Sequence, residues 1–267
     1  MSPETAPSPF ELVDWYVEMG VTEALAETPR NHFEDIPSEA ERAPRRAAAA
    51  APVAVRALPA AATAPDEAAT SAIAMAAEAM DLDALKAAMA RFEGCALKAT
   101  AKTLVFADGV PGSRVMLVGE APGAEEDRAG LPFVGRSGQL LDRMLATIGL
   151  DRQSNVYIAN LLPWRPPGNR TPTPQEVAIC LPFIQRQIAL ADPDILICIG
   201  GPSAQGLLGV SGILASRGKW LDYDTGRRTI RAMAMLHPAY LLRQPLQKRL
   251  AWRDLRSLRA ALAGKPA

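Results

Sequence analysis

Apolar residues gather in four short runs from residue 115 onward, and glycine, proline or polar residues bound each run. Short continuous apolar runs of this kind are typical of strands that are buried on both faces of a sheet. The four predicted strands cover residues 115–118, 155–162, 194–199 and 229–236.

The segments between these runs have the composition and length of helices. Residues 139–148, 175–190, 203–209 and 247–262 are the predicted helices, and an earlier helix begins at residues 81–83. In that earlier helix, Leu82, Leu85, Met89 and Phe92 fall on one face at helical spacing. Strands that alternate with helices predict an α/β fold, namely a three-layer α/β/α sandwich with a central four-stranded parallel sheet.

The first quarter of the chain has a different pattern. Residues 10–19 carry seven apolar residues, three of them aromatic, and predict a short helix within an N-terminal segment at 1–27. Residues 28–71 combine an alanine run with repeated prolines, which break helices, and we interpret them as a disordered linker. We expect the catalytic domain to span residues 72–267.

Charge separates the two parts of the chain. Residues 1–70 have 12 acids and 5 bases, a balance of −7, and residues 71–267 have 17 acids and 24 bases, a balance of +7. A basic domain favours a polyanionic partner, although the two ends can also simply neutralise one another. Residues 10–19 are a candidate segment for binding a protein partner; packing back onto the main domain is the alternative that we favour.

Cysteine content and hydropathy bear on the cellular compartment. The sequence has three cysteines, too few for a disulfide framework, and no apolar segment long enough to span a bilayer. The N-terminus has neither a basic segment nor an apolar run of the secretory type. We therefore expect an intracellular, cytoplasmic and nucleoid-associated monomer without membrane contact.

Polar residues follow three of the predicted strands. Glu120 and Glu126 follow the first strand, Asn160 and Asn169 the second, and His237 the fourth. The carboxyl ends of parallel strands meet at one edge of an open sheet, where α/β folds place their ligands. This convergence predicts a ligand-binding site that is built from these loops.

The loops resemble those of the family 4 uracil-DNA glycosylases. The matching segments are residues 119–127, 132–141 and 165–172, Asn160, and residues 237–242, in that order. The resemblance covers roughly residues 88–262 and leaves the N-terminal third unexplained. It implies an enzyme that flips uracil out of DNA and hydrolyses its N-glycosidic bond, which leaves an abasic site and free uracil.

The resemblance also implies roles for individual residues. Phe133 would stack on the flipped base, and Asn160 would read the polar edge of uracil, because an amide offers both a donor and an acceptor. Ala121 would line the substrate pocket. His237 would donate to the negative charge that develops on uracil O2. No lysine nucleophile stands in these motifs, so we expect a monofunctional glycosylase without lyase activity.

Ala121 stands where some relatives carry a catalytic aspartate, so another residue must position the attacking water. Glu120, Glu126 and Asn169 are the candidates, and the sequence does not rank them. Their alternative roles are turn solvation and loop stapling.

Several residues are predicted to contact DNA. Residues 241–243 resemble the wedge that fills the space left by the flipped base. Arginines in the motif loops and the basic C-terminal tail would bind phosphates, although any one of them can be a solvated surface charge. The predicted DNA-binding residues are Arg136, Arg170, Leu241, Leu242 and Arg243.

A second departure from the family concerns its cofactor. Family 4 members typically hold a [4Fe–4S] cluster on four cysteines. Only Cys95 and Cys180 match those positions, whereas Phe92 and Trp164 occupy the other two, and Cys198 matches none. Two thiolates cannot replace four, so we predict that the cluster is absent, that no metal is bound, and that packing of the two aromatic rings replaces it.

Alternative functions also fit the sequence. A member that has lost catalysis would recognise uracil or abasic DNA as a binding module. Another hypothesis is a glycosylase for a different deaminated base, such as hypoxanthine or xanthine. A generic nucleotide-binding domain is a weaker hypothesis, because the glycine-rich phosphate-binding fingerprints are absent from the sequence.

Overall fold

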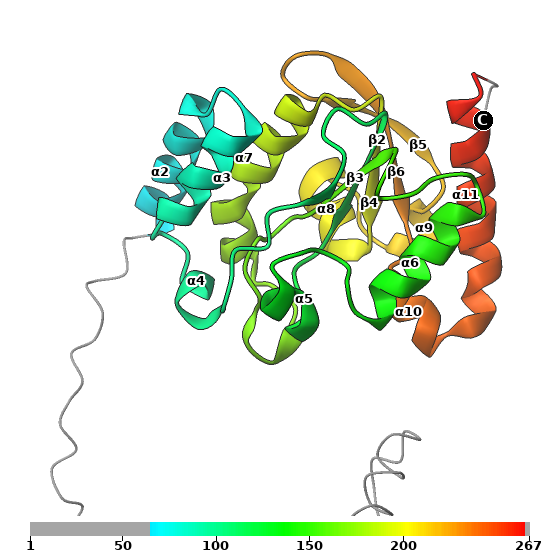
Figure 1. The fold of residues 1–267 in the computed structure, drawn as a ribbon, viewed down its shortest axis with the longest axis horizontal. Helices are drawn as coiled ribbons and strands as arrows, with labels where there is room; N and C mark the ends of the chain where they lie inside the picture. Colours follow the sequence, from blue (N-terminus) through cyan, green and yellow to red (C-terminus); the bar gives the residue numbers. More distant parts are fainter. Residues whose placement is uncertain (1–64, 265–267) are drawn as a thin grey trace, which may run out of the picture. The chain divides into compact units, whose positions relative to one another are not determined.

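The computed structural model describes residues 65–264, and the predicted segment at 1–27 lies outside the described residues. A central sheet lies between two layers of helices (Figure 1). The strands are β1 (Asp108–Gly109), β2 (Val115–Gly119), β3 (Val156–Asn160), β4 (Ile195–Ile199), β5 (Trp220–Asp224) and β6 (Thr229–Met235).

The sheet corrects one detail of the sequence prediction. Its order is β1-β3-β2-β4-β6-β5, so it has six strands rather than four. The inner four are parallel, but β1 pairs with β3 and β5 pairs with β6 in antiparallel fashion. The two edge strands escaped prediction because β1 has two residues and β5 alternates apolar with acidic residues, so neither forms a continuous apolar run.

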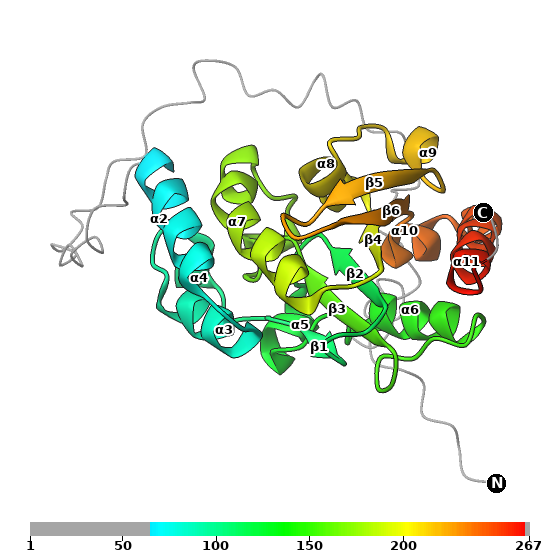
Figure 2. The same ribbon diagram turned by 90° about the horizontal axis from the view of Figure 1, so that it is seen from above.

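The three-layer architecture is confirmed, because each inner strand divides its side chains between two cores. On β2, Met116 and Val118 face one core, whereas Val115 and Leu117 face the other. Helices α2, α3, α7 and α8 cover the first core, and α6, α10 and α11 cover the second (Figure 2). Burial on both faces explains why β2 and β4 have no charged or amide side chain and why β3 has none before its last residue, Asn160.

Apart from α2, the longer helices agree closely with the predicted ones. Helix α3 is capped by Asp81, and α7 begins with a Thr173–Glu176 capping box. The helices are α2 (Pro65–Glu78), α3 (Leu82–Arg91), α4 (Leu97–Thr100), α5 (Ala124–Ala129), α6 (Arg136–Ala146), α7 (Pro174–Ala191), α8 (Gly201–Leu208), α9 (Ile213–Ser216), α10 (Pro238–Arg243) and α11 (Lys248–Leu262). In residues 65–264 no helix is both long and apolar enough to cross a membrane.

The boundary between linker and domain also needs correction. The predicted linker extended to residue 71, but α2 already begins at Pro65, a residue that suits the first turn of a helix. Ala68, Ala72 and Ala76 recur every four residues and are buried. Their small side chains allow α2 to pack closely on α7. Ala68, which the sequence prediction placed in the linker, therefore belongs to the surface of α2 that packs on the domain.

We predict that Ala72→Leu destabilises the domain, because Ala72 is fully buried and a larger side chain would separate α2 from the core. The expected cost is about 1–3 kcal/mol in the free energy of unfolding, measured by urea denaturation. Ala74→Leu on the exposed side of the same helix is the matched control and should have little effect. Equal stability of the two variants would show that α2 is not part of the folded domain.

Candidate active site

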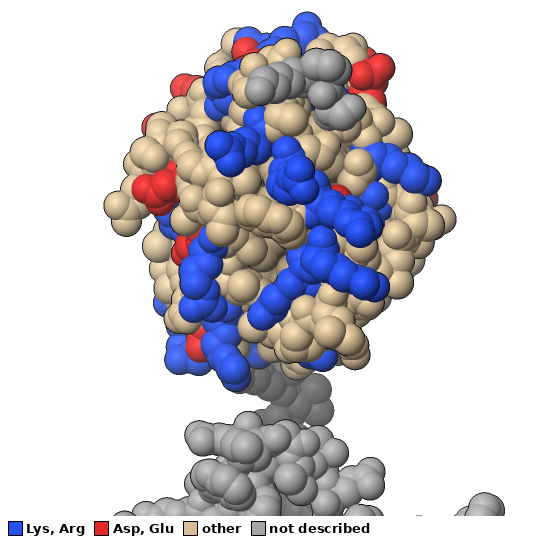
Figure 3. All heavy atoms as spheres, turned by 90° about the vertical axis from the view of Figure 1, so that its right-hand side faces the viewer, with Lys and Arg blue, Asp and Glu red and all other residues tan. Residues whose placement is uncertain are grey.

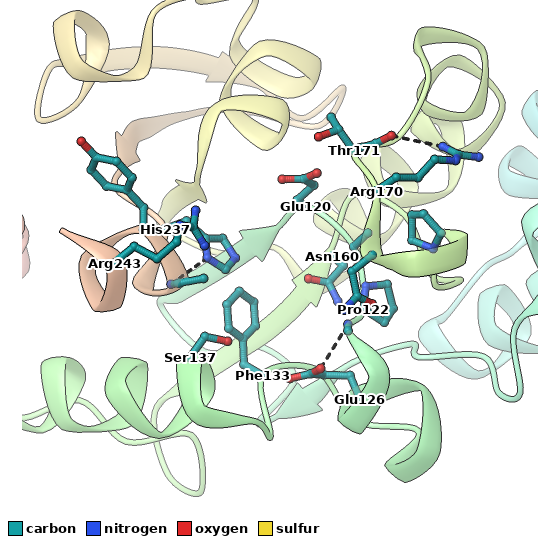
Figure 4. Close-up of a pocket in the computed structure, with 16 residues that line it drawn as sticks. Glu120, Pro122, Glu126, Phe133, Ser137, Asn160, Arg170, Thr171, His237 and Arg243 are labelled. Atoms are coloured by element: carbon teal, nitrogen blue, oxygen red, sulfur yellow. Dashed lines mark hydrogen bonds between the residues drawn. The ribbon is translucent and has the colours of Figure 1, made fainter. Parts of the chain in front are cut away.

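A pocket of about 460 Å³ opens where β2, β3 and β6 end (Figure 4). Nine of the twelve residues predicted for the site line this pocket. They are Glu120, Ala121, Glu126, Phe133, Asn160, Asn169, Arg170, His237 and Arg243. The convergence predicted from the strand ends is therefore present in the structure.

Close packing at the end of β2 brings the aromatic ring and the amide together. A Cβ atom on Gly119 would lie 2.5 Å from Asn160 Oδ1 and 2.6 Å from the Phe133 ring. Any side chain at Gly119 would therefore push these groups apart. Asn160 ends β3, and its side chain lines the pocket. The amide is thus available to a ligand in the pocket.

The loop that carries Phe133 has an unusual backbone. Phe133 has φ 54°, in the left-handed region that non-glycine residues seldom adopt. Gly138 permits this conformation, because a Cβ there would lie 1.8 Å from the Phe133 carbonyl oxygen. Such conformations persist only where their surroundings fix them.

Arg152 holds much of the Phe133 loop in this conformation. It donates from Nη1 to the Pro132 carbonyl at 3.1 Å and from Nη2 to the Phe133 carbonyl at 2.8 Å. Its guanidinium also pairs with Asp108 at 2.8 Å and Asp142 at 2.7 Å. Arg152 lies outside every motif in the sequence, where it looks like an ordinary loop arginine. Only the fold indicates that it positions Phe133.

Glu126 holds the opposite side of the same loops together. Its Oε2 accepts from the Gly123 N–H at 3.1 Å, and its Oε1 accepts from the N–H groups of Val134 and Gly135 at 3.1 and 3.0 Å. Both oxygens are therefore occupied by backbone donors. This arrangement is the loop staple that the sequence left open as one role of Glu126.

Asn169 and Glu120, the other two candidates for positioning the attacking water, differ in their hydrogen bonds. Asn169 also has a positive φ, 55°, and its Oδ1 accepts from Arg165 Nε at 2.7 Å. The Glu120 carboxylate faces the pocket (Figure 4), and within residues 65–264 it forms no hydrogen bond. Burial raises the pKa of Glu120 above its usual value. Glu120 is thus a carboxylate with open acceptor positions and increased basicity.

His237 is the N-cap of α10, and this position fixes its tautomer. Its Nδ1 accepts from the Ala239 N–H at 3.1 Å, so Nδ1 carries no proton and Nε2 is the protonated nitrogen. Burial, together with the charge of Arg243, lowers the pKa of His237 to about 4. The imidazole is therefore neutral near pH 7. Its ring stacks on Phe133, with 5.5 Å between the centroids.

The predicted DNA contacts occupy different environments. Arg136, Leu242 and Arg243 line a groove of about 580 Å³ that shares residues with the pocket. Arg170 already pairs with Glu176, with 2.6 Å from Nη2 to Oε1. Leu241 is only 1% exposed, because it packs into the core beside α6, so its predicted place in a surface wedge is wrong.

The cysteine pair does not form a site for a cubane cluster. Cys95 and Cys180 are buried with 3.9 Å between their sulfur atoms, and their hydrogen bond and burial raise the pKa of Cys180 well above its usual value. The Phe92 and Trp164 rings are stacked at 6.5 Å where the other two ligands would stand. Within residues 65–264 no group of three metal-ligating side chains converges. The residues present do not fit a [4Fe–4S] cluster.

The fold and site together define a class, an α/β protein with a ligand pocket at the carboxyl ends of its parallel strands. Comparison with known proteins identifies the superfamily within this class. Residues 106–256 match the model of the uracil DNA glycosylase superfamily. The match spans more than half of the chain, and the chain belongs to this superfamily.

Curated relatives agree with that assignment. The chain is 39% identical over 151 residues to a type-4 uracil-DNA glycosylase of Thermotoga maritima, covering 56% of this chain and 77% of the relative. It is 38% identical over 156 residues to the Archaeoglobus fulgidus protein of that name, covering 57% and 78%. The Pyrobaculum aerophilum protein of that name is 38% identical over 181 residues, covering 66% and 92%.

We predict that Arg152→Met loosens the Phe133 loop, because the carbonyls of Pro132 and Phe133 lose their donors. Amide hydrogen exchange at Val134 and Gly135 should become at least tenfold faster, while exchange in β4 changes little. Arg114→Met is the control, because Arg114 also bonds a carboxylate and a carbonyl but lies away from the pocket. Equal protection of the loop amides from exchange in both variants would contradict the proposal that Arg152 holds this loop in place.

Proposed function

We propose that this chain is a monofunctional glycosylase that excises uracil from DNA and leaves an abasic site. The observation that carries the proposal is the joint placement of Phe133, Asn160 and the neutral His237 in one pocket. An aromatic face, a polar amide and a neutral donor are the groups needed to stack, identify and release uracil. Family membership and the names of the relatives support the same conclusion.

Recognition begins with a base that has left the duplex, because the glycosidic bond is inaccessible within the stack. The flipped base stacks on Phe133, and the Asn160 amide pairs with its polar edge. Uracil presents a carbonyl and an N–H, so the amide can satisfy both, whereas cytosine reverses part of that pattern. Ala121, whose side chain is a single methyl, leaves room beside the base.

Departure of uracil places negative charge on its O2 while the sugar gains oxocarbenium character. His237 donates from Nε2 to that oxygen. A neutral donor that is already oriented needs no reorganisation as the charge develops, which is the basis of oxyanion stabilisation. The hydrogen bond from Ala239 to Nδ1 secures the donor tautomer.

Water completes the reaction at the sugar, and we assign its activation to Glu120. The Glu126 carboxylate accepts from three backbone donors, and Asn169 Oδ1 accepts from Arg165. Glu120 has open acceptor positions and a raised pKa, which make it the better base. No lysine lines the pocket within the described part of the chain, which supports simple hydrolysis without a covalent imine.

Contacts with the DNA backbone are assigned to the groove beside the pocket. Arg136, Leu242 and Arg243 line it, and the first and last can bind phosphates while Leu242 fills space near the extruded base. Arg170 would exchange Glu176 for a phosphate when DNA binds. Chemistry at the sugar needs no iron, and we propose that the protein folds and works without the cluster.

The proposed function predicts that the protein releases uracil from a labelled oligonucleotide and creates an alkali-labile abasic site. His237→Ala should lower kcat about 100- to 1000-fold, and Glu120→Gln should lower it strongly with little change in KM. Arg186→Gln, a change far from the pocket, is the control. Tight binding to uracil-containing DNA without release would favour the binding module, and release of only hypoxanthine or xanthine would change the assigned substrate.

The pH dependence follows from the pKa of His237. Because that pKa is lowered to about 4, the imidazole stays a neutral donor as the pH falls from 8 to 6. We therefore expect kcat to show no loss over that interval from protonation of His237. Glu120, whose pKa is raised, should produce the first decline at lower pH. A decline centred near pH 6.5 that disappears in His237→Gln would contradict the assignment.

Iron content tests the cofactor proposal. Protein purified without oxygen should contain far less than one iron per chain and no brown absorbance, and it should retain uracil release. Cys95→Ala should leave activity nearly unchanged, because its thiol has no ligand to hold. Four iron atoms per chain, lost in Cys95→Ala, would show that the cluster is present.

A further inference from the structure

The outer face of α11 carries a row of cations that the proposed function does not use. Five basic residues and one aromatic residue are exposed on this helix, and Trp252 is 44% exposed. At about 100° per residue they lie within an arc of about 140°. We call this set the α11 ridge; it comprises Lys248, Arg249, Trp252, Arg253, Arg256 and Arg259.

The cations of the ridge are not paired with acids of the described part of the chain. Within residues 65–264 none of them forms an ion pair. The one acid of α11, Asp254, is buried and bonded to Arg217. Besides burial, the charge of Arg253 lowers the pKa of Arg217, which is a sign of crowded positive charge. Figure 3 shows Lys and Arg gathered on this side of the molecule with few acids among them.

The ridge continues the surface that leads out of the pocket. Arg243, the last residue of α10, lines both the pocket and the adjoining groove. Only Gln244 to Gln247 separate it from Lys248, and Leu246 in this connection is 83% exposed. A polyanion that leaves the groove beside Arg243 therefore meets the first turn of α11 next.

We propose that the α11 ridge binds the phosphate backbone of the DNA that flanks the flipped nucleotide. The cations extend about 16 Å along the helix, the rise of about five nucleotides of one strand. Arginines of this kind neutralise phosphates without reading sequence, and Trp252 can pack on a sugar or an unstacked base. This inference rests on the proposed function for the choice of DNA as partner.

The chain contains a competing anion. Residues 10–41 hold nine acids and one base, so an acidic protein segment is the alternative occupant of the ridge. DNA is the better match, because the ridge adjoins the groove beside the pocket and four of its five cations are arginine, which suits phosphate oxygens. The alternative becomes an outcome of the test.

The test compares two double variants of the full chain. Arg253→Gln with Arg256→Gln removes two ridge cations, and Lys86→Gln with Arg91→Gln removes two exposed cations of α3 on the opposite side of the molecule. Binding to a duplex without uracil is measured from 50 to 200 mM salt. The slope of log K against log salt should become shallower by about 2 in the ridge variant and stay unchanged in the α3 variant.

Separate readouts keep this inference distinct from the proposed function. Uracil release at saturating DNA should be the same in the ridge variant and the unaltered protein, because neither arginine lines the pocket. Absence of release from the unaltered protein contradicts the proposed function but leaves the salt slopes informative. An unchanged slope in the ridge variant overturns the inference; if that variant also loses affinity for a peptide of residues 10–41, the ridge belongs to an acidic protein segment.

Discussion

The hydrogen bond from the Ala239 N–H to His237 Nδ1 is the interaction on which the proposed chemistry of this pocket depends. It forms because His237 is the N-cap of α10, where a backbone donor has no partner within the helix. The bond leaves the proton on Nε2, and burial keeps the ring neutral, with a pKa of about 4. Ring stacking then aligns the imidazole with Phe133. A helix start thus provides the oriented neutral donor to which we assign stabilisation of departing uracil.

The rest of the site is a set of constraints that hold other groups around that donor. The missing side chain of Gly119 lets Asn160 and Phe133 approach each other. Glu126 and Arg152 fix the two ends of the Phe133 loop through its backbone groups, so the strained conformation of Phe133 is determined from both sides. These contacts use carboxylate and guanidinium groups that look catalytic by type. Glu126 accepts from backbone N–H groups, and Arg152 bonds two backbone carbonyls as well as Asp108 and Asp142. We therefore assign the activation of water to Glu120, whose carboxylate faces the pocket.

The sequence was informative where one physical signal dominates. Continuous apolar runs predicted the inner strands, and their shared direction predicted that Glu120, Asn160 and His237 meet. Prediction failed where stability comes from contacts between distant segments. The edge strands lack an apolar run. Residues 65–71 of α2 looked like linker, because the role of their alanines depends on packing against α7. Leu241 matched a wedge motif but is buried, and Arg152 belongs to no motif at all.

The most direct test of the account is the protonation state of His237, observed by nitrogen-15 NMR of the imidazole. The sequence has two histidines, so His32→Gln assigns the signals. The account predicts one neutral tautomer, protonated at Nε2 and bare at Nδ1, that persists as the pH falls from 8 to 5. A ring that titrates near pH 6.5, or one protonated at Nδ1 at neutral pH, would contradict the claim that this histidine is a neutral, oriented donor.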